Sequence, residues 1–134
     1  MESAVRFTLA ALLTALAIIH FYWAAGGTWG AQSAIPSVRG GQPLFKPGSL
    51  GTAVVGFLML AGAAVASGQL LPVLQTILLR CMAALFMLRA VGEFRYLGIF
   101  KRVSGTQFAY WDTRLFSPLS AVLGLLAFLG SLSD

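Results

Sequence analysis

The chain has 134 residues, of which 58% are hydrophobic and 10% charged, and its mean hydropathy is +0.85. Soluble domains carry about 25% charged residues, so this composition argues against a water-soluble globule. One cysteine and one histidine exclude a disulfide framework, a bis-His haem and most zinc sites within a single chain, and we expect no metal and no cofactor.

Four mainly apolar stretches are each long enough to cross a bilayer, which takes about 20 residues. They cover about residues 7–25, 50–71, 74–94 and 115–132. The aromatic run from Phe21 to Trp23 favours a retained first helix over a cleaved signal peptide. Because the four stretches and their connections fill residues 1–134, we expect a single membrane domain. The predicted fold class is all-α, a polytopic membrane protein built as a four-transmembrane-helix bundle.

Small residues recur at four-residue spacing in the second stretch, as at Gly62 and Ala66. Such pairs let helix backbones approach closely in lipid, and packing within one bundle explains them more simply than a dimer interface. Cys81, within the third stretch, is expected to be an inert thiol in the core.

Two long connections, residues 26–49 and 95–114, separate the spans, and in a four-helix bundle both emerge on the same side. We call this side, with the adjoining helix ends, the loop face. It receives every Trp, every Tyr and seven of the nine cations, whereas the other side holds Glu2, Arg6, Arg80 and Asp134. Basic residues favour the cytoplasm, so we predict cytoplasmic loops with both termini outside, although Arg6 before the first span argues the other way. Membrane lipids are a more plausible partner for these cations than nucleic acid.

Ionisable residues near the membrane are the first candidates for chemistry. His20 and Glu93 are candidate catalytic residues, and His20 is alternatively an interfacial histidine bonded to a carbonyl or to Glu93. Arg89 and Glu93 lie four residues apart, which favours an ion pair over a carboxylate held ready for proton transfer.

The remaining candidates concern ligand binding. Arg95 and Arg114, with Lys101 and Arg102, form a basic group near the surface, where contact with anionic lipid is expected. Asp112 is expected mainly as the N-cap of the fourth helix. The predicted binding residues are Trp23, Trp29, Arg89, Arg95, Tyr96, Asp112 and Arg114.

Two segments, HFYWAAGGTWG at residues 20–30 and LRAVGEFRYLGIFKRV at residues 88–103, resemble the domain-of-unknown-function 3995 family. The resemblance continues through GTQF at residues 105–108 and DTRLFSPL at residues 112–119. It implies a small bacterial integral membrane protein, but no activity or substrate.

Four functions therefore remain open. The first is an inner-membrane protein that binds an anionic amphiphile, held by Arg89, Arg95 and Arg114. The second is a membrane-embedded enzyme that uses His20 and Glu93 as an acid/base pair, and the sequence leaves open whether the protein is catalytic. The third is a small oligomeric transporter, and the fourth is an accessory or structural subunit with a membrane-protein partner.

Overall fold

The computed structural model describes residues 1–68 and 70–132. Gln69, in the predicted second span, and Asp134, predicted on the side opposite the loops, lie outside the described residues. The described chain is helical, with only an isolated β-bridge between Ser37 and Pro43. Its elements are α1 (Glu2–Ala24), α2 (Ala31–Ala34), α3 (Ser49–Ser67), α4 (Pro72–Val91), α5 (Gln107–Trp111), the π-helical turn η1 (Asp112–Phe116) and α6 (Ser117–Gly130).

Four helical stretches among the described residues are long and apolar enough to cross a membrane: Glu2–Ala24, Ser49–Ser67, Pro72–Val91 and Gln107–Gly130. The predicted all-α class with four transmembrane helices is therefore confirmed. By length and composition the chain is a multi-pass membrane protein.

The fourth helical stretch begins earlier than predicted, at Gln107 rather than near residue 115. The Thr106 hydroxyl caps it by accepting a hydrogen bond from the Ala109 N–H at 3.0 Å. Further along, Pro118 has no N–H to donate to the preceding turn. The turn before Pro118 is the π-helical turn η1, in which the Ser117 N–H donates to the carbonyl of Asp112, five residues earlier. One continuous stretch thus contains a π turn that rotates the residues before it relative to α6.

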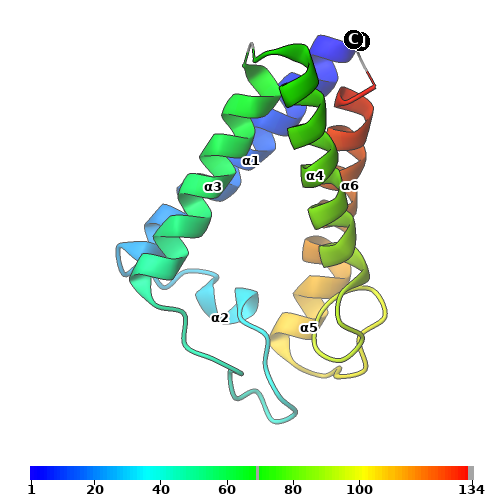
Figure 1. Ribbon diagram of the computed structural model, residues 1–134. Coiled ribbons are helices and arrows are strands. Elements are labelled where there is room, and N and C mark those ends of the chain that lie inside the picture. Colours follow the sequence, from blue (N-terminus) through cyan, green and yellow to red (C-terminus); the bar gives the residue numbers. More distant parts are fainter. Residues whose placement is uncertain (69, 133–134) are drawn as a thin grey trace.

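The four long helices are arranged as two pairs, α1 with α3 and α4 with α6, and α1 also contacts α6 (Figure 1). The two pairs converge at the end that carries both termini and separate toward the two long loops. At the loop end, α2 packs against α5 and connects one pair to the other.

The main hydrophobic cluster explains this shape, because most of its buried residues come from the parts of the helices away from the two long loops. Leu9, Leu13, Leu79 and Leu123 are fully buried there, one or two from each of α1, α4 and α6. α3 contributes Ala63 and Ala66, so residues of its small-residue stripe pack inside the bundle, as predicted. Cys81 is exposed on α4, and its prediction as a core thiol is wrong because it lies on the outward face of that helix.

Two polar side chains join helix ends at the terminal end of the bundle. Gln75 on α4 is buried, and its Nε2 donates to the carbonyls of Val65 at 2.9 Å and Gly68 at 3.0 Å. Arg6 on α1 donates to the Gly130 carbonyl of α6 at 2.9 Å and 3.2 Å. Carbonyls at the ends of membrane helices need such partners where water is scarce.

Candidate functional site

The carboxylate of Asp112 is fully buried at the loop end of the fourth helical stretch. Its Oδ1 accepts a hydrogen bond from Arg89 Nη2 at 2.8 Å, and its Oδ2 lies 3.2 Å from Lys101 Nζ. The Gly98 N–H also donates to Oδ2, at 2.8 Å. We call Arg89, Lys101 and Asp112 the ion cluster. A carboxylate out of water is stable only with such partners, so the ion cluster fixes the loop of residues 92–106 to α4 and η1.

The backbone of this loop reaches Asp112 because it folds directly against the end of α4. Gly92 and Gly98 have φ values of +78° and +93°. A Cβ on Gly92 would lie 2.6 Å from the Cα of Gly98, closer than any side chain permits. The Ile99 N–H donates to the Ala90 carbonyl at 2.8 Å and holds the crossing in place. Two glycines are therefore needed to bring the Gly98 N–H to Asp112.

Glu93 organises the same loop from its exposed side. Its Oε1 accepts hydrogen bonds from the N–H groups of Arg95 at 3.2 Å, Tyr96, and Leu97 at 3.1 Å. The Tyr96 N–H, the other two amides and the Arg95 charge together lower the pKa of Glu93 below its ordinary value of 4.5, although desolvation acts in the opposite direction. The carboxylate is thus a cap for the loop backbone.

This cap predicts a local response to acid. A carboxyl whose folded pKa is lowered stabilises the loop above pH 4.5, and that contribution is lost as the pH falls through the lower folded pKa. We expect protection of the Tyr96 and Leu97 amides to fall over that range in hydrogen-exchange rates corrected for the intrinsic effect of pH. Glu93→Gln should reduce their protection at neutral pH and remove the acid response. Constant protection well below pH 4.5 in the wild-type protein would contradict the capping role.

Two predicted roles at this site are wrong. Arg89 does not pair with Glu93, because the loop carries Glu93 away from the axis of α4 and onto its own amides. Asp112 is not an N-cap, because the helix already begins at Gln107 and Thr106 caps it. A separate expectation, that Lys101 lies near the surface, is also wrong, because only 5% of its side chain is exposed.

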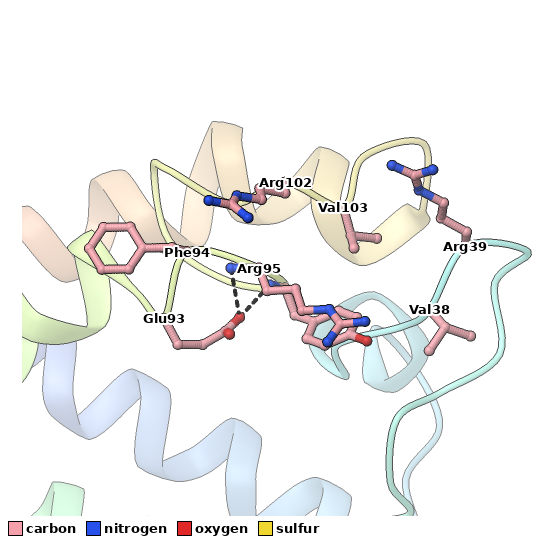
Figure 2. Close-up of a pocket in the computed structure, with 8 residues that line it drawn as sticks. Val38, Arg39, Glu93, Phe94, Arg95, Arg102 and Val103 are labelled. Carbon is pink, nitrogen blue, oxygen red and sulfur yellow. Dashed lines mark hydrogen bonds between the residues drawn. The ribbon is translucent and has the colours of Figure 1, made fainter.

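A cavity of about 790 Å³ lies on the outer side of the same loop, between it and the segment that follows α2. We call it the arginine cleft, because Arg39, Arg95 and Arg102 line it together with Tyr96 and Glu93. Figure 2 shows Arg39 approaching from the segment after α2, while Arg95 and Arg102 come from the loop after α4. Three guanidinium groups and one carboxylate leave a formal charge of +2, and that carboxylate is already bonded to backbone amides.

Arg95 and Arg102 are held in the cleft by their own backbone. The Arg95 carbonyl accepts hydrogen bonds from the N–H groups of Arg102 at 3.0 Å and Val103 at 2.8 Å. The Arg95 guanidinium lies over the Tyr96 ring, 5.0 Å from its centroid. Both arginines are exposed, so their donors face the cleft and solvent together.

The two tryptophan candidates, Trp23 and Trp29, lie at the end of α1 and in the turn after it, and neither lines the arginine cleft. Trp23 Nε1 donates to the Trp29 carbonyl at 2.8 Å, and the Trp29 N–H donates to the Tyr22 hydroxyl at 3.2 Å. Gly27 packs against the Tyr22 ring, leaving no room for a side chain there. These contacts close the turn after α1, and the Trp29 ring itself stays exposed.

His20 is not placed with Glu93. Its Nδ1 lies 2.7 Å from the Leu16 carbonyl one turn earlier in α1, and its ring meets the edge of Trp23. It lines a different cavity from Glu93. Within residues 1–68 and 70–132, no three His, Cys, Asp or Glu side chains are grouped so that they could hold a metal ion.

The predicted binding residues therefore divide into separate groups. Arg95 and Tyr96 line the arginine cleft, Arg89 and Asp112 belong to the ion cluster, and Arg114 lies over the Tyr110 ring at 3.9 Å from its centroid. Arg39 and Arg102 were not among the predicted binding residues. Their charge placed them on the loop face, but sequence spacing gave no sign that two loops bring them together.

A comparison with protein families matches residues 13–127 to the family described as "Protein of unknown function (DUF3995)". Neither the curated proteins nor the solved structures give a match. The matched range runs from the middle of α1 to near the end of α6 and includes the ion cluster and the three arginines of the cleft. The family suspected from the sequence is thereby confirmed, and the chain belongs to the DUF3995 family of proteins of unknown function.

Proposed function

We propose that this protein binds an anionic amphiphile, and that the arginine cleft holds a phosphate-bearing headgroup. The observation that carries the proposal is the convergence of Arg39, Arg95 and Arg102 from two loops on one cavity. Guanidinium groups present paired N–H donors that match phosphate oxygens, which favours a phosphate over a neutral headgroup.

The position of the cleft suits a ligand anchored in lipid. The cleft lies at the loop end, beyond the C-terminal end of α4, where a membrane helix meets the interface. Exposed Phe94 also lines it, so an apolar surface accompanies the charged one. In this proposal the protein resides in a bacterial inner membrane with the loop face in the cytoplasm, where anionic lipid headgroups attract basic residues.

The alternative of an acid/base enzyme has less support. His20 and Glu93 line different cavities, and both are engaged by backbone groups of their own segments. The three arginines, by contrast, line a single cavity.

Replacing all three cleft arginines, as Arg39→Gln/Arg95→Gln/Arg102→Gln, tests the proposal. Each cation near a membrane surface contributes about 1 kcal/mol toward an anionic headgroup, so we expect roughly 100-fold weaker binding. Native mass spectrometry of protein in mild detergent, titrated with phosphatidylglycerol and with phosphatidylcholine, measures the change. The same spectra report whether the protein is a homo-oligomer.

The matched control is Arg80→Gln, which removes a cation near the middle of α4 that is not part of the cleft lining and should leave retention of phosphatidylglycerol unchanged. A further titration with inorganic phosphate distinguishes a headgroup anchored by its chain from a free anion. Equal retention of both lipids by the wild-type protein, or no effect of the triple substitution, would overturn the proposal.

A further inference from the structure

A second cavity, of about 560 Å³, lies between the C-terminal end of α1, helix α2 and the N-terminal end of α3. Its lining is mostly apolar and includes Trp23, Ile35, Phe45 and Val55. We call it the His20 pocket, because His20 is part of its wall. Its lining residues are distinct from those of the arginine cleft.

The His20 pocket is open because small residues line the start of α3. A Cβ added at Gly48 or Gly51 would have no atom within 4 Å. Ala31 and Ala34 of α2 face the same space from the other side. The volume falls within the range of small-molecule sites and is far too small for both chains of a phospholipid.

Two polar groups on the wall define the chemistry of a ligand. The Leu16 carbonyl can only accept, so Nδ1 of His20 carries the proton and Nε2 of the neutral ring keeps its lone pair. Lys46 lines the pocket from the segment before α3 and brings a positive charge. The pocket has no acidic lining residue, and within the described part of the chain Lys46 has no carboxylate partner.

We propose that the His20 pocket binds a single-chain carboxylic acid lipid. The chain occupies the apolar space between α1, α2 and α3, and the headgroup lies between Lys46 and His20. The imidazole Nε2 accepts a hydrogen bond from the acid O–H or, once protonated, donates to the carboxylate, while Lys46 supplies the charge that favours the anion. This proposal is independent of a ligand in the arginine cleft.

Trp23 provides a reporter inside the pocket, because Trp29 and Trp111 are not part of its lining. In Trp29→Phe/Trp111→Phe protein, Trp23 keeps its bond to the backbone carbonyl at position 29. We expect a dibrominated fatty acid to quench Trp23 fluorescence saturably. Its methyl ester, which has the same chain without the charge, should bind about fivefold more weakly or worse, the affinity that one surface cation contributes.

Substitutions in this single-tryptophan protein test the pocket itself. Gly51→Leu fills open space and should abolish saturable quenching, whereas Val54→Phe adds bulk elsewhere on α3 and should not. Lys46→Gln should weaken the acid to the affinity of its ester. Arg39→Gln/Arg95→Gln/Arg102→Gln should leave quenching unchanged, which separates this proposal from the one above.

Equal quenching by the acid, the ester and a dibrominated phosphatidylcholine would mean contact with bulk lipid and would overturn the proposal. So would undiminished quenching in folded Gly51→Leu protein, with folding checked by circular dichroism. If that variant does not fold, the comparison of acid with ester in the unaltered pocket decides the question.

Discussion

Replacing Asp112 with Asn is expected to destabilise the protein by about 3–5 kcal/mol, the usual cost of removing one partner from a buried ion pair. The substitution leaves the guanidinium of Arg89 and the ammonium of Lys101 without their counter-charge. The exposed fraction of the Lys101 side chain is only 5%, so water replaces little of what is lost. The loss should appear as a lower midpoint of thermal unfolding, followed by circular dichroism in detergent.

Glu2→Gln is the matched control for Asp112→Asn. It also removes one carboxylate that faces an arginine, but the Glu2 side chain is 49% exposed and lies 3.6 Å from Arg6. Exposed pairs contribute about 0–1 kcal/mol, so the midpoint should hardly move. If the two variants lose similar stability, the ion cluster is not the anchor that the structure indicates.

A second large effect is expected at the crossing of the loop over α4. In Gly98→Ala, the new Cβ would lie 2.5 Å from the Cα of Gly92, and the φ of +93° disfavours any side chain. Backbone must move to relieve this contact, which takes the amide of residue 98 away from Asp112. We expect destabilisation of about 3 kcal/mol or more, since strain of this kind and the loss of a charge-assisted hydrogen bond add together.

Gly105→Ala separates strain from contact. Gly105 also has a positive φ, +81°, but a Cβ there would meet no atom within 4 Å. Gly105→Ala should therefore lower the free energy of unfolding only by the cost of placing a side chain on a left-handed backbone, about 1–2 kcal/mol. Unfolding midpoints of the two variants give the comparison, and equal losses would mean that the crossing of Gly92 and Gly98 is not tightly packed.

The sequence by itself determined the class of this protein and the location of its apolar helices. Length and hydropathy suffice for that. A bilayer requires long helices whose backbone hydrogen bonds are formed within the helix, whatever the tertiary arrangement. Ala66, one of the small residues at four-residue spacing, likewise lies inside the bundle as predicted, since close packing in lipid demands small side chains. The resemblance of residues 20–30, 88–103, 105–108 and 112–119 to a known family was also sufficient to identify the family.

Only the tertiary structure decided which charges meet. Helical spacing predicted a pair between Arg89 and Glu93, but the helix ends at Val91, and the two positive φ values at Gly92 and Gly98 turn the loop back. That turn frees Arg89 for Asp112, 23 residues away, and buries Lys101 against the same carboxylate. Sequence periodicity describes neighbours within one helix and carries no information about partners across a loop. The positions of Arg39 and Arg102 in one cleft, and of His20 and Lys46 in another, depend on the same folding of the loops.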